Sequence, residues 1–172
     1  MDAAAYTFRT ELGWVGISSS KQGIQRFILP QSSFTNVCQQ LSINLQPDSE
    51  LPISLHDIVE RLNLYFNGYQ TSFPDELDLS AGTDFQRKVW DITRLIPYGE
   101  TRSYSWIAGK IGNLNTVRAV GQALGENPLP VIVPCHRVLT KDGGLGGYER
   151  GIEMKRYLLW LEASAYLRDR TL

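Results

Sequence analysis

The sequence predicts an α/β protein in two parts, a small α/β domain at residues 1–82 followed by a mainly α-helical domain at residues 83–172. Two observations indicate this fold class. Short β-type runs separated by turn residues precede Pro30, and apolar residues at helical spacing dominate the remainder. A length of 172 residues with 42% hydrophobic and 20% charged residues is typical of a globular protein with a real core.

The N-terminal part begins with a predicted three-strand meander. Aromatic and β-branched residues fill residues 6–8, 14–17 and 24–29, glycine-containing turns separate them, and Pro30 is expected to end the last strand. Residues 73–82 have the alternation of a further strand that passes into the linker between the two parts.

Two helices are predicted in the N-terminal part. Ser33 is a candidate N-cap for a short helix whose apolar face includes Cys38, which makes that thiol a core residue rather than a nucleophile. A firmer helix starts at Ser54 and ends before Gly68, a residue type that favours helix C-termini. His56 falls on the polar side of this helix, and we interpret it as a surface residue rather than a ligand.

Three more helices are predicted at the start of the C-terminal part. The first is capped by Thr83 or Asp84, the second starts after Ser103 and closes at Gly112, and the third begins near Thr116. The last two would form a helix-turn-helix, which in many proteins presents its second helix to DNA. Helix pairs with tight turns also occur in proteins that bind no DNA, so this pattern alone leaves both interpretations open. The apolar positions of the first helix are Phe85, Val89, Trp90, Ile92, Leu95 and Ile96.

The charge is distributed unevenly along the chain. Residues 1–82 carry four basic against nine acidic side chains, whereas residues 83–172 carry thirteen against nine. If the protein binds a polyanion, the C-terminal part is therefore expected to bind it.

The composition also argues against several classes of protein. Residues 1–5 lack the basic start of a secretory signal, and no stretch reaches the roughly 20 apolar residues of a membrane span. Cys38 and Cys135 are too few for a disulfide framework, and with His56 and His136 as the only imidazoles no zinc ligand set can be assembled. We therefore expect a cytoplasmic protein without a metal or cofactor.

The segment most informative about function is Val-Ile-Val-Pro-Cys-His-Arg-Val at residues 131–138. Its apolar start predicts a short buried strand-like run that must end at Pro134, which places Cys135 at a turn. A thiol held where regular structure breaks, beside the imidazole of His136, has what a nucleophile needs. The alternative interpretation is structural, since free cysteine is often simply buried.

A glycine-rich loop and a last helix follow this segment. Residues 140–147 hold four glycines, so the backbone there can approach a ligand closely. The helix at residues 151–162 is expected to turn Lys155 and Arg156 toward solvent, and the polar tail beyond Ala163 is expected to fray.

Taken together, these motifs resemble the O6-alkylguanine-DNA alkyltransferase family, almost continuously over residues 83–162. The resemblance implies a ribonuclease-H-like N-terminal domain and a winged helix-turn-helix-like C-terminal domain. It also implies one-step DNA repair, in which an alkyl group leaves O6 of guanine, or O4 of thymine, and stays on the motif cysteine. The motifs are Arg-Ala-Val-Gly at 118–121, Asn127-Pro128, Pro-Cys-His-Arg-Val at 134–138, Gly147-Tyr148 and the helix from Lys155 to Glu162.

The resemblance assigns catalytic roles to individual residues. Cys135 accepts the alkyl group, His136 takes the thiol proton through a water molecule, and Glu162 orients the imidazolium, as in a catalytic triad. Attack on an sp3 carbon needs a thiolate, and a thiol with the ordinary pKa of about 8.5 is only a few per cent ionised at pH 7. We expect the sulfur to be held partly ionised. Tyr104 matches a tyrosine whose hydroxyl lies near N3 of the base.

The remaining site residues also follow from the resemblance. Lys155 matches a residue near the active-site turn, and Asn127 braces the turns that support Cys135. Backbone groups at Val138 and around Tyr148 would read the guanine edge. The thioether product has no hydrolytic exit, so each molecule is expected to act once, without cofactor or metal.

The partner implied by the resemblance is double-stranded DNA that contains O6-alkylguanine, with the target base flipped into the pocket of a monomeric protein. Arg118 matches an arginine finger that fills the vacated place, and Tyr104 crowds the phosphate so that the nucleotide rotates outward. Phosphate contacts are expected from Ser105, Asn113 and Lys141, with the helix-turn-helix in the minor groove.

Two further functions compete with this one. A lesion sensor on the same fold would transfer nothing, but such proteins replace the cysteine that this chain keeps. A cysteine hydrolase built on Cys135, His136 and Glu162 would turn over repeatedly and need no DNA. Glu149 and Arg150 stand where many relatives have small residues, which leaves the tolerance of bulky alkyl groups open.

Overall fold

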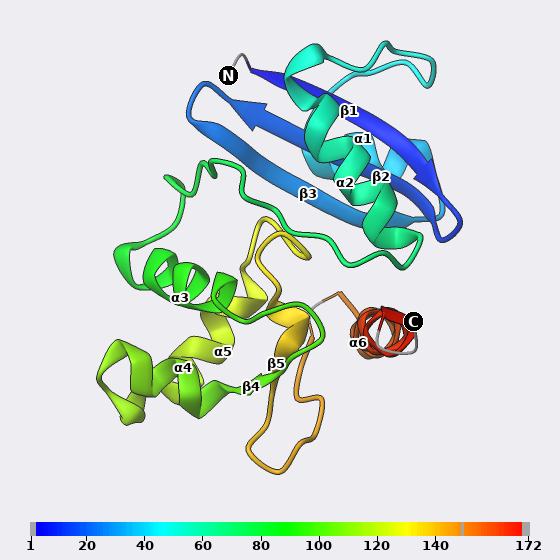
Figure 1. The fold of residues 1–172 in the computed structure, drawn as a ribbon. Coiled ribbons are helices and arrows are strands. Elements are labelled where there is room, and N and C mark those ends of the chain that lie inside the picture. Colours follow the sequence, from blue (N-terminus) through cyan, green and yellow to red (C-terminus); the bar gives the residue numbers. More distant parts are fainter. Residues whose placement is uncertain (1–2, 149, 170–172) are drawn as a thin grey trace. The chain divides into compact units, whose positions relative to one another are not determined.

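The computed structural model describes residues 3–148 and 150–169. The chain divides into two compact units, Met1–Leu79 and Ser80–Leu172, both drawn in Figure 1. The first combines a small antiparallel sheet with two α-helices, and the second is mainly helical. The predicted mixed α/β class is therefore confirmed.

The sheet of the first unit has the order β1-β2-β3, with β1 at Ala4–Thr10, β2 at Gly13–Ser20 and β3 at Gly23–Gln31. All neighbouring strands are antiparallel, so the predicted meander is confirmed. The prediction that Pro30 ends the last strand is wrong by one residue, because Gln31 still pairs with β2.

Two α-helices accompany the sheet, α1 at Phe34–Leu41 and α2 at His56–Phe66. Ser33 caps α1 as predicted, and its hydroxyl accepts a hydrogen bond from the backbone of the first turn. Cys38 is buried on the apolar face of α1, whereas His56 is exposed at the start of α2. Neither residue faces a site with evident chemistry.

The predicted strand at residues 73–82 is wrong. Its backbone makes a single isolated parallel bridge, between Leu77 and Ile24 at the start of β3. Two hydrogen bonds fix this bridge, from Ile24 N to Glu76 O at 2.9 Å and from Asp78 N to Ile24 O at 2.8 Å. Gly23 lets the two backbones approach this closely, since a Cβ there would overlap the Glu76 carbonyl.

The second unit begins with three helices that match the predicted ones. Thr83 caps α3 in a reciprocal capping box with Gln86, and Ser103 caps α4. Leu95 is 67% exposed, contrary to the prediction that it widens the apolar stripe, because α3 ends one residue before it. Gly112 closes α4 with φ of 93°, a left-handed conformation that glycine tolerates. The elements are α3 at Asp84–Arg94, α4 at Tyr104–Ile111, the 3-10 turn η2 at Leu114–Thr116 and α5 at Val117–Gly125.

The segment after α5 is buried but is not the strand-like run that its apolar residues predict. Pro130 and Val133 form a single bridge around a tight turn, in which Val131 has φ of 75°. The prolines in this stretch have no backbone N–H to donate to a neighbouring strand. The Asn127 side chain bonds to the backbone instead: it donates to Val133 O at 2.9 Å and accepts from Leu129 N at 2.9 Å.

Cys135 lies at a turn, as predicted. It starts a 3-10 turn, η3, at Cys135–Arg137, which leads directly into β5 at Val138–Leu139. β5 pairs in parallel with β4 at Arg102–Ser103, immediately before α4. This short pairing fixes the cysteine turn relative to the start of the helix pair.

The last helix, α6, runs over Ile152–Asp169 (Figure 1). The expectation of a frayed tail beyond Ala163 is therefore wrong as far as Asp169. The placement of Lys155 on the solvent side of the helix is also wrong, since the residue is fully buried. Arg156 is exposed as expected.

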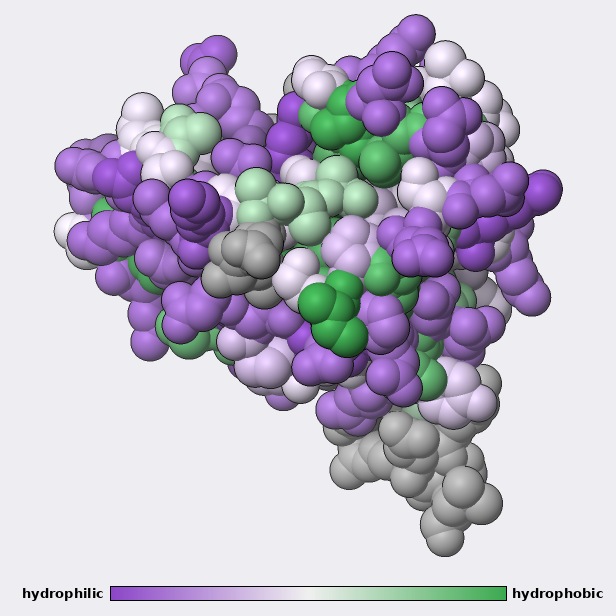
Figure 2. Space-filling view, turned by 90° about the horizontal axis from the view of Figure 1, so that it is seen from above, coloured by the Kyte–Doolittle hydropathy of each residue, from purple (hydrophilic) through white to green (hydrophobic). Residues whose placement is uncertain are grey.

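The surface seen in Figure 2 is mostly hydrophilic, with hydrophobic residues in small separate patches. Among the described residues no helix combines the length and apolar character needed to cross a bilayer. Large apolar side chains that are strongly exposed include Ile53, Tyr69, Leu95, Leu114 and Trp160.

Candidate active site

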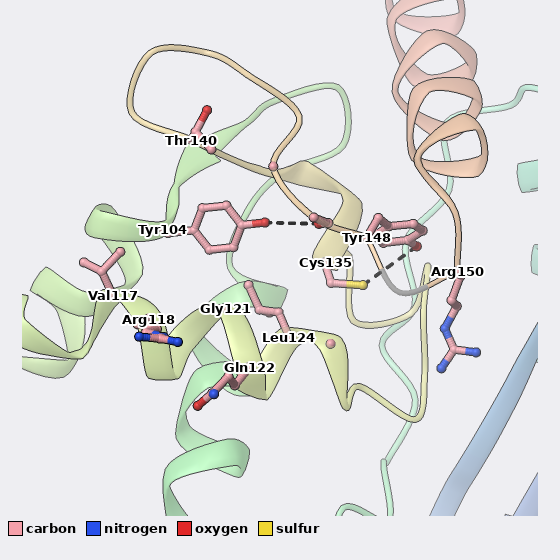
Figure 3. Close-up of a pocket in the computed structure, with 13 residues that line it drawn as sticks. Tyr104, Val117, Arg118, Gly121, Gln122, Leu124, Cys135, Thr140, Tyr148 and Arg150 are labelled. Atoms are coloured by element: carbon pink, nitrogen blue, oxygen red, sulfur yellow. Dashed lines mark hydrogen bonds between the residues drawn. The ribbon is translucent and has the colours of Figure 1, made fainter.

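A cavity of about 620 Å³ opens in the second unit, between α4, α5, the cysteine turn and the loop at residues 140–147. Figure 3 shows α5 along one side of it, Tyr104 of α4 across from that helix, and Tyr148 beside Cys135. The residues that line it are Tyr104, Val117, Arg118, Gly121, Gln122, Leu124, Gly125, Cys135, Thr140, Gly146, Gly147, Tyr148 and Arg150.

The sulfur of Cys135 reaches this cavity although the residue is only 6% exposed. The Asn127 side chain donates a hydrogen bond to it at 3.2 Å, and the thiol lies 3.9 Å from the Tyr148 hydroxyl, to which it donates (Figure 3). A thiol fixed by two partners and reached from one side suits attack on a small electrophile.

Burial raises the pKa of the Cys135 thiol. Hydrogen bonding with Asn127 and Tyr148 and the charges of Arg150 and Lys155 oppose this effect but do not cancel it. The expectation of a partly ionised sulfur is therefore wrong for this structure. The neutral thiol is favoured at pH 7, and a base must remove its proton before attack.

The candidate base is His136, which is fully buried beside the sulfur-bearing residue. Its Nε2 lies 2.6 Å from Oε1 of Glu162 in α6. Burial lowers the pKa of His136, and the hydrogen bond and charge of Glu162 only partly reverse this, so the imidazole is neutral at pH 7. An ionised carboxylate only accepts hydrogen bonds, so Nε2 carries the proton and Nδ1 is the basic nitrogen.

Burial alone would raise the pKa of Glu162, but the hydrogen bonds and charges of His136 and Arg137 outweigh it and lower the pKa to about 2. Further hydrogen bonds from Arg137 and Gly99 hold this carboxylate. Arg137 donates from Nε to Oε2 at 2.9 Å and from Nη2 to Oε1 at 3.0 Å, and the backbone N–H of Gly99 donates to Oε2 at 3.0 Å.

Sequence reasoning missed Arg137. The residue is buried, and its side chain pairs with Glu162, donates to the Ile96 carbonyl at 2.7 Å and stacks over the Tyr98 ring at 5.5 Å. The signal was present, because an arginine directly after a buried motif can remain charged there only if it is paired.

Lys155 of α6 is buried beside the site. Its ammonium donates to Val138 O at 2.6 Å and to the Leu145 carbonyl, and it lies 5.7 Å and 5.8 Å from the ring centres of Tyr104 and Tyr148. Burial lowers its pKa to about 8, against a smaller opposing effect of Cys135. Through these two hydrogen bonds the ammonium links Val138, directly after the cysteine turn, to Leu145 in the glycine-rich loop.

The remaining predicted site residues lie as follows. Asn127 is buried under the cysteine turn, and Val138 is buried with its carbonyl bound to Lys155, outside the cavity lining. Tyr104 lines the cavity, and its hydroxyl donates to Gly147 O at 3.4 Å (Figure 3). Burial, with a smaller contribution from Cys135, raises the pKa of Tyr104.

The predicted DNA-contacting residues fall into two groups. Arg118 is exposed on α5 and lines the cavity, so the structure brings it together with Cys135. Ser105, Asn113 and Lys141 are not among the lining residues. Ser105 is half-buried with its hydroxyl 2.8 Å from that of Ser103, Asn113 caps η2, and Lys141 is exposed in the glycine-rich loop.

Arg150 lines the cavity and donates to the Asn127 carbonyl at 2.9 Å, whereas Glu149 lies outside the described residues. Within residues 3–148 and 150–169, no group of three or more histidine, cysteine, aspartate or glutamate side chains is arranged to hold a metal ion.

Comparison with known proteins identifies the relatives of this chain. Residues 84–164 match the family model of the 6-O-methylguanine DNA methyltransferase DNA-binding domain. The methylated-DNA–protein-cysteine methyltransferase of Mycobacterium bovis is 53% identical over 121 residues, which cover 70% of this chain and 73% of that one. The constitutive enzyme of the same name from Bacillus subtilis is 40% identical over 162 residues, 93% of this chain and 95% of its own.

A solved structure shares the fold as well. Mycobacterium tuberculosis OGT in complex with DNA matches with a TM-score of 0.76 and 42% identity, over 94% of this chain and 93% of that one. With two relatives above 30% identity that are matched over most of their length, the chain belongs to the methylated-DNA–protein-cysteine methyltransferase family.

Proposed function

We propose that this chain repairs alkylated DNA directly, as a methylated-DNA–protein-cysteine methyltransferase that moves an alkyl group from O6-alkylguanine to Cys135. The observation that carries this proposal is the position of the sulfur. It lies in a cavity that also has Arg118 in its wall, on the second helix of a helix-turn-helix. An alkylated base can therefore reach Cys135 while the duplex that the base has left contacts Arg118.

The transfer is a single displacement. The sulfur of Cys135 attacks the alkyl carbon, an S–C bond forms, and the bond between that carbon and O6 breaks. The electron pair of the broken bond stays on guanine, which takes up one proton while the thiol gives up one. The thioether that results has no leaving group for water to displace under mild conditions, so each molecule acts once.

His136 acts as the general base for the thiol. Its imidazole is neutral at pH 7, its Nε2–H donates to Glu162, and Nδ1 receives the proton. An intervening water carries the proton, because the sulfur itself is hydrogen-bonded to Asn127 and Tyr148. Glu162 stabilises the imidazolium that forms.

Tyr104 and Lys155 assist the leaving group and the thiolate. The raised pKa of Tyr104 keeps its hydroxyl protonated, so it can donate a hydrogen bond toward N3 of guanine as negative charge develops on the ring. The Lys155 ammonium, near the rings of Tyr104 and Tyr148, adds positive charge beside the sulfur. Backbone groups around Tyr148, in the lining of the cavity, recognise the guanine edge, whereas Val138, whose carbonyl binds Lys155 outside the lining, would need to exchange that partner to take part.

The partner is duplex DNA with the target nucleotide flipped out of the stack, at a cost of a few kcal/mol. Arg118 fills the vacated position, and Ser105, Asn113 and Lys141 contact phosphates around it. The protein acts as a monomer in this scheme. We also infer that the first unit is ribonuclease-H-like and that the second is a winged helix-turn-helix-like domain.

Intact mass spectrometry tests the function. Incubation with a duplex that carries one O6-methylguanine is expected to add one methyl group per chain, on the peptide that contains Cys135. Cys135→Ala is expected to bind the duplex and accept nothing. Cys38→Ala is the matched control and should be methylated as fully as the wild type, because Cys38 is buried in the other unit.

The other outcomes identify the competing functions. Repair of more than one equivalent of lesion with unmodified protein would refute irreversible transfer and favour a cysteine hydrolase. Tight binding of the lesion by the wild type, with neither methylated protein nor repaired DNA, would favour a sensor.

A further inference from the structure

Arg137 is a buried side chain with several hydrogen bonds next to the proposed catalytic residues, and the transfer scheme does not use it. Its guanidinium contacts both oxygens of Glu162, through Nε to Oε2 at 2.9 Å and Nη2 to Oε1 at 3.0 Å, and its Nη1 donates to the Ile96 carbonyl at 2.7 Å. The ring of Tyr98 lies 5.5 Å beneath it. One planar group thus joins the cysteine turn, α6 and the segment after α3.

The carboxylate of Glu162 has little freedom in this arrangement. Gly99 N–H and Arg137 hold Oε2, which leaves Oε1 to be shared between Arg137 and Nε2 of His136 at 2.6 Å. A bidentate guanidinium fixes the plane of a carboxylate as well as its position. The two hydrogen bonds from the Arg137 guanidinium therefore set the orientation of Glu162 toward His136.

The charges around His136 come from two elements. Glu162 and Lys155 project from α6, while Arg137 and Cys135 flank the histidine in the cysteine turn. Without Arg137, the carboxylate would act on the imidazole as an unbalanced negative charge and favour the imidazolium, which cannot accept a proton. Arg137 offsets the negative charge of Glu162, and its own positive charge disfavours a second positive charge on His136.

We propose that Arg137 is a positioning residue for alkyl transfer, whose guanidinium holds the Glu162 carboxylate on Nε2 of His136 and keeps the imidazole in the neutral form that accepts the thiol proton. This inference rests on the proposed function and adds a fourth residue to its proton relay. Arginine is needed rather than lysine, because a single ammonium cannot reach both carboxylate oxygens and the Ile96 carbonyl in one plane.

The test is the pH dependence of single-turnover methyl transfer from an O6-methylguanine duplex. Arg137→Met should lower the plateau rate by at least about tenfold and move the acid limb to higher pH, because the pKa of His136 rises when the cation is lost. Arg137→Lys keeps the charge, so its acid limb should stay in place while its plateau falls by about tenfold. Arg156→Met is the matched control, since that arginine is exposed on α6 and pairs with Glu153 of the same helix, and both parameters should stay at wild-type values.

A second readout does not depend on the Met variant. The chain has two histidines, so a nitrogen NMR spectrum of labelled histidine shows the tautomer of His136 directly, with exposed His56 as internal reference. The wild type should show the neutral form with the proton on Nε2 at pH 7, and Arg137→Lys should show exchange broadening or a mixed tautomer.

The outcomes separate this inference from the function on which it rests. A wild type that accepts no methyl group refutes the function itself. A transferring wild type together with an Arg137→Lys variant that has the wild-type plateau and tautomer overturns the positioning role. If Arg137→Met does not fold, the lysine variant decides alone, and a folded methionine variant with an unshifted acid limb also overturns the proposal.

Discussion

At the residue scale, the reactivity of Cys135 depends on the atoms that hold its sulfur. Asn127 is the central support, since one amide group donates to the sulfur at 3.2 Å and to Val133 O at 2.9 Å and accepts from Leu129 N at 2.9 Å. All these groups are buried, so none can exchange its partner for bulk water. The same side chain therefore stabilises the turn and favours the thiolate.

Asn127→Ala is expected to lower the free energy of unfolding by about 3 kcal/mol, because it leaves the Val133 carbonyl and the Leu129 N–H buried without their partner. It should also slow alkylation of Cys135 by iodoacetamide at pH 8, since the pKa of the thiol rises when a donor is removed. Urea unfolding by tryptophan fluorescence and mass spectrometry of the labelled protein measure the two effects.

Asn115→Ala provides the control, because Asn115 is exposed in the turn before α5 and should change the free energy of unfolding by less than about 0.5 kcal/mol. Equal stability and equal thiol reactivity of the Asn127 variant and the wild type would contradict the supporting role.

At the element scale, the loop at residues 140–147 closes one side of the cavity against Tyr104. Gly146 has φ of 65°, and a Cβ there would lie 3.0 Å from the Tyr104 hydroxyl. Gly143 has φ of 83° but faces open space, with no atom within 4 Å of a Cβ. The two glycines share the left-handed backbone and differ in what they face.

Gly146→Ala and Gly143→Ala form a matched pair. Both should lower the free energy of unfolding by about 1 kcal/mol through backbone strain. Only Gly146→Ala should displace Tyr104 and lower the rate of methyl transfer, by at least about tenfold. Single-turnover kinetics decide the point, and equal rates for the two variants would show that loop contact with Tyr104 is irrelevant to transfer.

At the scale of the whole molecule, the buried ion cluster connects the stability of the second unit to pH. Glu162 has a pKa of about 2 in the folded protein against an ordinary value of 4.5. Between these values the unfolded chain binds more protons than the folded one, so stability increases with pH. The contribution is complete above pH 4.5 and is lost as the pH falls through about 2.

The free energy of unfolding of the wild type should therefore fall steeply between pH 4.5 and pH 2, with up to about 3 kcal/mol of the loss due to Glu162. Urea titrations at several pH values measure the slope. Other carboxylates contribute to this slope too. The slope of the wild type is therefore compared with that of the double variant Arg137→Met/Glu162→Gln, which removes both charges and so leaves no unpaired buried charge. Identical slopes for the two proteins would contradict the assignment.

Much of the fold and of the site could be predicted because the signals are local. Ser33, Thr83 and Ser103 cap helices where the sequence places them, since capping depends on one side chain and the next turn. The strand expected at residues 73–82 failed because pairing needs a partner, and only Leu77 finds one. The run before Pro134 failed because hydrophobicity predicts burial but not backbone geometry.

The sequence by itself predicted the family and the helices α3 to α5, and it singled out Cys135 as the proposed nucleophile, because the cysteine motif and the helix signals are contiguous in the chain. Only the tertiary structure decided the protonation state of that nucleophile, the burial of Lys155 and the place of Arg137. These depend on α6 packing against a turn that is distant in sequence, where burial raises the pKa of the Cys135 thiol and the Glu162 carboxylate pairs with both Arg137 and His136.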